Sequence, residues 1–268
     1  MLDIERRAQI MEILKENNSM SVVRLSKQLY TSEATIRRDL TKLENEGLVK
    51  RTYGGVVLIE GLKTEIPLSM REREQQESKN LIGKVAASLV RDGSIIILDS
   101  SSTTSNMVRH LAGKNNLSIL TNGAKTAVML GEGCHANIYC TGGKLRRNSL
   151  SFIGEEARAF IARYHVDTMF FSCRGLVFED GLFDSSTEEA ELRRAMIKSA
   201  KKRVLLCDST KIGKHSFQRI CNIQEINTII TNAQINTETI QALQEKKSRD
   251  NSHIKDKTLG LCPKPRKL

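Results

Sequence analysis

The feature that most constrains the fold is an alternation of short apolar runs with amphipathic stretches through residues 76–246. The apolar runs predict strands near 94–98, 117–121, 137–140, 167–172, 203–208 and 226–231. The stretches between and around them predict helices near 76–91, 103–112, 123–131, 149–163, 187–200 and 236–246. Strands that alternate with helices form a mostly parallel sheet covered by helices on both faces. We therefore expect residues 76–246 to form one α/β domain.

Composition narrows the class of protein further. Hydrophobic residues make up 39% of the 268 residues, and the longest apolar runs, such as 95–98, are too short to cross a bilayer. The N-terminus has no apolar segment of the kind found in signal peptides. The six cysteines include no C-x-x-C pair and no Cys/His cluster with the spacing of zinc ligands. We expect a cytoplasmic protein with reduced thiols, without a bound metal or other cofactor, and not associated with membranes.

Residues 3–58 predict a small domain of three helices and a hairpin. Residues 3–16 form the first helix, and Ser21 caps a second helix whose apolar residues are spaced i, i+3 and i+7. Ser32 caps a third helix, which ends at Asn45-Glu46-Gly47. The hairpin follows in residues 48–58, where two β-branched runs flank Gly54-Gly55. This order is typical of a winged helix-turn-helix, with the helix-turn-helix at about residues 20–39.

The third helix carries the pattern expected of a DNA-binding surface. Ile36, Leu40 and Leu43 form its buried stripe, so the other side chains face solvent or the DNA major groove. The predicted contacts from the helix are Ser32, Ala34, Thr35, Arg37, Arg38, Thr41 and Lys42. Those from the hairpin are Lys50, Arg51 and Tyr53, which reach phosphates or the minor groove. Asp39 lies to one side, where it orients either Arg38 or a neighbouring segment.

Alternatively, the charged side chains of this helix and hairpin form an ordinary solvated surface, because most runs of charged residues do so. Net charge does not decide the matter, since residues 1–60 carry ten Lys/Arg against nine Asp/Glu. That near balance disfavours a protein that simply compacts DNA. Most of the net charge of +11 comes from the C-terminal end, and residues 247–268 have no apolar period. We expect this tail to be disordered, and a solvated tail is favoured over one that adds non-specific DNA affinity.

The N-terminal pattern resembles the DeoR family of bacterial transcription regulators. The resemblance rests on Arg6, Ile10 and Leu14, on the run Ser32–Leu40, and on Leu43, Glu46-Gly47 and the Tyr53-Gly54-Gly55 turn. It implies sequence-specific binding to double-stranded operator DNA. Regulators of this kind bind paired half-sites, so we expect a homodimer or homotetramer.

Polar residues follow several of the predicted strands of the α/β domain. Asp99-Ser100-Ser101-Ser102-Thr103-Thr104 joins a strand to a helix, where free N–H groups and hydroxyls suit a phosphate. A serine-rich helix cap is an equally common reading of such a run. Other strand ends supply Thr121-Asn122 and Gly142-Gly143. Lys211 is either a fixed cation for a phosphate or sugar oxygen, or a solvated loop lysine.

The order of these loops resembles the sensor domain of DeoR regulators, which is similar to ribose-5-phosphate isomerase and related sugar-phosphate enzymes. The resemblance implies a phosphorylated sugar or related metabolite bound at Ser100–Thr104, Thr121-Asn122, Gly142-Gly143 and Lys211. The chain departs from the family at Ser100-Ser101, where glycine is frequent. Arg174 also departs, and it either contacts a carboxylate or second phosphate of the ligand or packs between subunits.

Two functions remain in competition. The first is a repressor of a carbohydrate operon that its effector releases from DNA. The second is a sugar-phosphate isomerase or deaminase with an appended DNA-binding domain, which needs a general base such as Asp99, Glu188 or Glu189. The five histidines are isolated and none pairs with a plausible nucleophile, so we predict no catalytic residues. The predicted domains are therefore 3–58 for DNA, 59–75 as a linker, 76–246 for the effector and 247–268 as the tail.

Overall fold

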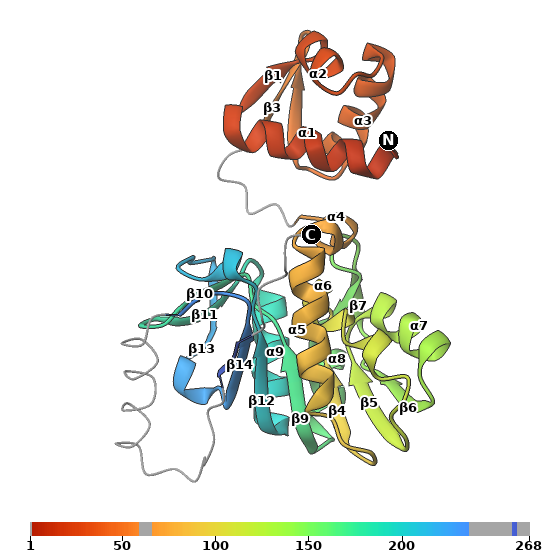
Figure 1. Ribbon diagram of the computed structural model, residues 1–268, viewed down its shortest axis with the longest axis vertical. Coiled ribbons are helices and arrows are strands. Elements are labelled where there is room, and N and C mark those ends of the chain that lie inside the picture. Colours follow the sequence, from red (N-terminus) through yellow and green to blue (C-terminus); the bar gives the residue numbers. More distant parts are fainter. Residues whose placement is uncertain (1, 59–65, 236–258, 262–268) are drawn as a thin grey trace. The chain divides into compact units, whose positions relative to one another are not determined.

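The structure is a computed structural model, and it describes residues 2–58, 66–235 and 259–261. The chain divides into two compact units, Met1–Arg71 and Glu72–Leu268 (Figure 1). Residues 68–73, expected in the linker, form helix α4 (Leu68–Arg73), with Leu68 and Met70 buried. The predicted helix at 236–246 lies outside the described residues. So does the tail, apart from the strand at 259–261.

The N-terminal unit contains three helices and a small antiparallel sheet. The helices are α1 (Asp3–Asn17), α2 (Val22–Gln28) and α3 (Glu33–Asn45). The strands are β1 (Ser19–Ser21), β2 (Val49–Thr52) and β3 (Gly55–Leu58), in the order β1-β3-β2. Ser21 and Ser32 cap α2 and α3 as predicted, because their hydroxyls accept the N–H groups of Arg24 and Thr35. Strand β1 was not predicted, since its three residues carry no alternation signal and are ordered by pairing with β3.

The larger unit is built on a parallel sheet, with strand order β15-β14-β12-β9-β4-β5-β6 among the described residues (Figure 1). Its strands are β4 (Ile95–Leu98), β5 (Leu117–Thr121), β6 (Ala136–Cys140), β9 (Val166–Phe171), β12 (Ala200–Leu206), β14 (Thr228–Thr231) and β15 (Leu259–Leu261). The first six match the predicted strands. Strand β15 lies in the segment that was expected to be disordered, and it pairs with β14.

Helices cover both faces of this sheet, which confirms the predicted fold class. The helices are α5 (Gln76–Ser88), α6 (Ser102–Ser105), α7 (Ala124–Gly133), α8 (Glu155–Ala162) and α9 (Thr187–Ser199). Successive residues of a strand point to opposite faces. Ile96 and Leu98 accordingly pack in the core beneath α5 and α7, whereas Ile97 packs in the core beneath α8 and α9.

Two predicted helices are shorter than expected. The stretch 103–112 forms only α6 and a single 3-10 turn, Val108–His110. The stretch 149–163 becomes helical only at α8, because residues 151–153 form β8 (Ser151–Ile153), which pairs with β7 (Lys144–Arg146). Gly154 separates β8 from α8 at φ +99°, a conformation that only glycine adopts readily.

A second, antiparallel sheet was not predicted at all. It consists of β10 (Gly175–Val177), β11 (Gly181–Asp184) and β13 (Gln218–Cys221), in the order β10-β11-β13. These strands are too short to show clear alternation. The central strand β11 ends at Asp184, shortly before α9 begins. This places the carboxylate of Asp184 beside the polar cluster described below.

Candidate functional site

The third helix, α3, presents the predicted polar face. Its apolar stripe is completely buried, and the side chains of Ala34, Arg37, Arg38 and Lys42 are exposed. Ser32 is also exposed, whereas Thr35 and Thr41 are half-buried. Lys50 and Arg51 of β2 and Tyr53 of the turn between β2 and β3 are exposed, as expected of a wing. The structure thus gathers all ten predicted DNA contacts on α3 and the wing.

The cations of this face differ in their partners. Arg37 pairs with Glu33 at 2.8 Å, and Lys42 pairs with Asp3 at 2.9 Å. Arg38 contacts only the hydroxyl of Thr35, at 3.4 Å, and has no carboxylate partner in the described part of the chain. Arg51 donates to the hydroxyl of Thr41 at 2.8 Å, which links the wing to α3. Arg38 is therefore the cation of α3 most available to an external anion or base.

Asp39 does not orient Arg38, which was the first of the two predicted alternatives. It is buried and accepts two hydrogen bonds from Arg6 of α1, Nε to Oδ2 at 2.5 Å and Nη2 to Oδ1 at 3.2 Å. The second alternative, a neighbouring chain segment, is correct. The hydrogen bond to Asp39 raises the pKa of Arg6 although burial acts in the opposite direction. This pair ties α3 to α1 from within the domain.

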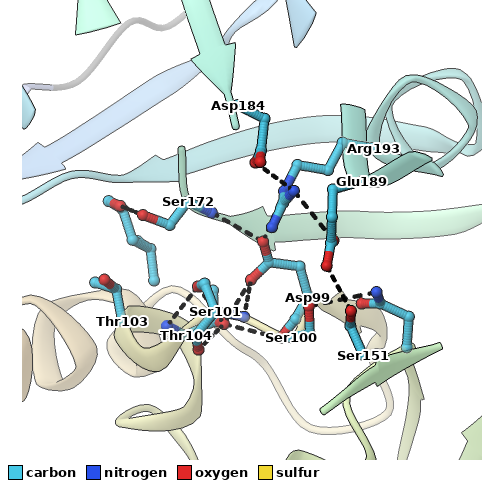
Figure 2. Close-up of polar contacts among 12 residues, drawn as sticks. Asp99, Ser100, Ser101, Thr103, Thr104, Ser151, Ser172, Asp184, Glu189 and Arg193 are labelled. Atoms are coloured by element: carbon cyan, nitrogen blue, oxygen red, sulfur yellow. Dashed lines mark hydrogen bonds and ion pairs between the residues drawn. The ribbon is translucent and has the colours of Figure 1, made fainter. Parts of the chain in front are cut away.

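In the larger unit, Asp99 follows β4 and holds the turn into α6 (Figure 2). Its Oδ1 accepts the N–H of Ser101 at 3.0 Å and the hydroxyl of Thr104 at 2.6 Å. The hydroxyl of Ser101 caps α6 by accepting the N–H of Thr104. The N–H groups of Ser102 and Thr103 have no acceptor among the residues described. The turn is thus both a helix cap and a source of unused donors.

Lys211 reaches this turn from the loop after β12, which lies two strands away from β4 in the sheet. Its Nζ lies 3.1 Å from the hydroxyl of Thr103, 2.9 Å from that of Ser172 and 3.1 Å from Oδ2 of Asp208. Burial acts to raise the pKa of Asp208, but the charge of Lys211 and hydrogen bonds from Thr210 and Lys211 outweigh it and lower that pKa. Lys211 is therefore a fixed cation, and the reading as a solvated loop lysine is wrong.

The neighbouring strand ends meet the same turn. Asn122 donates to the hydroxyl of Ser100 at 3.4 Å and to the carbonyl of Phe152 at 3.2 Å. Its Oδ1 is buried and has no hydrogen-bond partner in the described residues. Thr121 is buried, and its hydroxyl accepts the N–H of Gly123 at 3.0 Å. Of these groups, the Asn122 Oδ1 is the one left for a ligand.

The glycines after β6 have a backbone explanation. Gly142 and Gly143 have φ of +64° and +98°, and a Cβ at Gly143 would lie 2.6 Å from the carbonyl of Ile153. Packing against β8 therefore requires glycine at 143. The backbone N–H of Arg174 donates to the carbonyl of Phe183 at 2.8 Å, and its side chain is half-buried. Both predicted roles of Arg174 stay predictions.

Sequence reasoning missed the arginine beneath the turn. Arg193 of α9 contacts Asp99, Asp184 and Glu189, and all four side chains are buried (Figure 2). Burial acts to lower the pKa of Arg193, but the three carboxylates raise it well above its usual value. The available signal was its position, because Arg193 lies on the stripe of α9 that also carries Ala190 and Met196. A charged residue on a buried stripe requires partners.

The carboxylates considered as general bases are engaged in ion pairs. Asp99 and Glu189 are bound to Arg193, and Ser151 also donates to Glu189. Glu188 is exposed, 3.7 Å from both Lys144 and Arg146. In the described ranges, no group of three His, Cys, Asp or Glu side chains is arranged to hold a metal ion. No helix among those residues is long and apolar enough to span a membrane.

Comparison with known proteins agrees with this architecture. Residues 6–61 match the DeoR-like helix-turn-helix domain, and residues 74–233 match the DeoR C terminal sensor domain. The chain is 36% identical over 247 residues to the uncharacterized HTH-type transcriptional regulator YulB of Bacillus subtilis (strain 168), covering 92% of this chain and 95% of the relative. It is 33% identical to the HTH-type transcriptional repressor GlcR of the same organism, covering 85% of this chain and 87% of the relative.

A solved ribose 5-phosphate isomerase A from Methanocaldococcus jannaschii shows a TM-score of 0.40 and 16% identity, covering 52% of this chain and 55% of that chain. The sequence relatives are regulators of transcription and not enzymes. These relatives align with both units of the chain, and each unit matches one of the two DeoR domain families. The chain belongs to the DeoR family of DNA-binding transcriptional regulators.

Proposed function

We propose that this regulator represses an operon of carbohydrate metabolism and that a phosphorylated sugar releases it from the operator. Residues 3–58 bind the operator, residues 59–75 link the domains, and residues 76–246 bind the effector. The protein acts in the cytoplasm as a homodimer or homotetramer, since paired half-sites require paired DNA-binding domains.

In this proposal, α3 lies in the major groove and the wing contacts the backbone. Arg38 and Thr35 reach base edges, because Arg38 has no competing carboxylate among the described residues and both point away from the buried stripe. Lys50 and Arg51 of β2 and Tyr53 of the following turn contact phosphates or the minor groove. Arg37 and Lys42 first exchange their surface carboxylates for phosphates, at little cost because such pairs are weak.

The observation that carries the effector proposal is the position of Lys211. Its ammonium group lies beside Thr103, in the turn whose Ser102 and Thr103 N–H groups have no acceptor within the described part of the chain. An ammonium group and unused backbone donors at one turn are the groups that bind a phosphate dianion. All three N–H donors of Lys211 are already engaged, so an incoming phosphate must replace at least one of these contacts.

The sugar part of the effector is supported by Asn122. Its buried Oδ1 lacks a hydrogen-bond donor in the part of the chain that the structure describes, and a sugar hydroxyl beside the phosphate would supply one. Buried unpaired acceptors are rare and costly, so this atom favours a hydroxylated ligand over a simple inorganic anion.

The test is operator binding in the presence of matched sugars and sugar phosphates. The operator is first selected from random duplex DNA, and its affinity is measured by fluorescence anisotropy with each compound. We expect release by at least one sugar phosphate and none by the corresponding free sugar at equal concentration. Lys211→Met should abolish this release and Ser102→Ala should weaken it. Lys214→Met, which removes an exposed lysine from the same loop, is the matched control and should respond as the wild type does. Equal release by the free sugar would overturn the proposal.

A further inference from the structure

Arg193 contacts carboxylates from three places in the fold with two of its nitrogen atoms. Its Nε donates to Oδ2 of Asp99 at 3.1 Å. Its Nη1 donates to Oδ2 of Asp184 at 2.6 Å and to Oε2 of Glu189 at 3.3 Å. Figure 2 shows the guanidinium group among the carboxylates of Asp99, Asp184 and Glu189. The planar fork thus connects the end of β4, the end of β11 and α9.

Asp99 connects Arg193 to the Ser101–Thr104 turn. While Oδ2 is held by Arg193 and by the N–H of Ser172 at 3.2 Å, Oδ1 holds Ser101 and Thr104. A carboxylate fixed at one oxygen by two donors cannot rotate without breaking both bonds. The geometry of the turn therefore depends on an arginine that does not itself belong to the turn.

The same contact controls local charge. Asp99 places a buried negative charge directly beneath the turn where an anion is to bind. Like charges at short range oppose each other, strongly so away from water. Arg193 reduces this charge only in part, because its single positive charge is shared among Asp99, Asp184 and Glu189.

We propose that Arg193 is a positioning residue of the effector site, which holds the Ser101–Thr104 turn in its binding geometry through Asp99. The expected effect on effector affinity rests on the proposed effector function, whereas the positioning itself rests on the contacts of Asp99 with Arg193 and with the turn. Lysine does not reproduce this arrangement, because the guanidinium holds Asp99 and Asp184 from two different atoms of a planar group, Nε and Nη1, whereas lysine has only Nζ.

The test compares Arg193→Lys with Arg158→Lys in the full-length protein. Arg158 of α8 also pairs with two carboxylates, Glu155 and Glu191, but at the surface, which makes it a matched control. Hydrogen exchange of the peptides that carry the Ser101 and Ser172 amides should accelerate about tenfold or more in Arg193→Lys, since a lost charged hydrogen bond has about that effect. Exchange in α1–α3 and β12 should stay unchanged, and Arg158→Lys should behave as wild type throughout.

The second readout is binding, with inorganic phosphate and the sugar-phosphate panel as probes in calorimetry. Arg193→Lys should weaken binding of the active probe by about tenfold or more, while operator affinity without effector changes by less than about twofold. Unchanged exchange at Ser101 and Ser172 would overturn the positional inference. Loss of protection throughout the sensor domain would overturn it as well, because it would show a general structural role.

The two proposals fail in different ways. If exchange at the turn accelerates as expected but the wild type binds no phosphate or sugar phosphate, Arg193 positions the turn and the proposed effector chemistry is wrong. If the wild type binds a sugar phosphate and Arg193→Lys binds it equally well, the effector proposal stands and Arg193 is not needed for it.

Discussion

Arg6 of α1 and Asp39 of α3 form a buried ion pair in which both carboxylate oxygens accept from one guanidinium. Asp39 is buried, whereas its neighbour Arg38 is exposed on the polar face of α3. Arg7 adds a second connection at 2.7 Å through Glu46, the C-cap of α3. The helix that would enter the major groove is thus fixed to α1 at its middle and at its C-terminal end by side-chain contacts.

Replacing Asp39 by Ala should destabilise the DNA-binding domain by about 3–5 kcal/mol, because Arg6 is left buried without its carboxylate. The measurement is urea unfolding followed by circular dichroism. Replacing both Arg6 and Asp39 by leucine should cost clearly less than Asp39→Ala, since no buried charge remains. The account would be contradicted if the double leucine variant lost as much unfolding free energy as Arg6→Leu and Asp39→Leu lose together.

Arg38→Ala should weaken operator binding by about 1–3 kcal/mol without a change in melting temperature, because Arg38 is exposed and its one side-chain hydrogen bond within the described ranges is to Thr35. Anisotropy with the selected operator measures the loss. The control is Lys201→Ala, which removes an exposed cation from the sensor domain and should leave affinity unchanged. Wild-type affinity in Arg38→Ala would show that α3 does not read bases through this residue.

Lys50→Ala should lower affinity for all DNA sequences alike, because a wing lysine contacts phosphate and not base edges. The slope of log affinity against log salt should become shallower by about one unit, the value for one lost phosphate contact. An unchanged slope would show that Lys50 lies away from the backbone.

The Lys211–Asp208 pair predicts a pH dependence of stability. The pKa of Asp208 is lowered from its ordinary value of 3.8, so the pair contributes stability above that value and loses it as pH falls through the lowered pKa. The difference in unfolding free energy between wild type and Asp208→Asn should therefore be constant near neutral pH and shrink below about pH 4. Unfolding in urea at a series of pH values measures it. A difference that does not change with pH would contradict the assigned ion pair.

Much of the fold was predictable because it rests on periodicity. The apolar runs of β4, β5, β9 and β12 are buried on both faces, which makes them continuous in sequence, and the stripe of α3 follows the helical repeat. Strands β1, β10, β11 and β13 were missed because each has only three or four residues and no continuous apolar run like that of β4. Strands β1 and β13 also pair with strands that are distant in sequence.

The residues of the candidate sites were likewise predicted only in part. Residues of the Ser100–Thr104 turn and Lys211 were identified because polar residues at strand ends meet at one edge of a parallel sheet. The role of Asp39 was left open and that of Arg193 was missed, because each depends on a partner far along the chain. Arg6 is 33 residues from Asp39, and Asp99 is 94 residues from Arg193. No local pattern encodes such a pairing.

The most direct test of the account is to measure the coupling between effector and operator in both directions. With the sugar phosphate that releases the operator best, its Kd is determined by calorimetry for the free protein and for the protein–operator complex. Linkage requires that the operator weakens effector binding by the same factor by which the effector weakens operator binding, and we expect about 5–150-fold. Equal effector affinity with and without the operator would contradict effector-controlled repression.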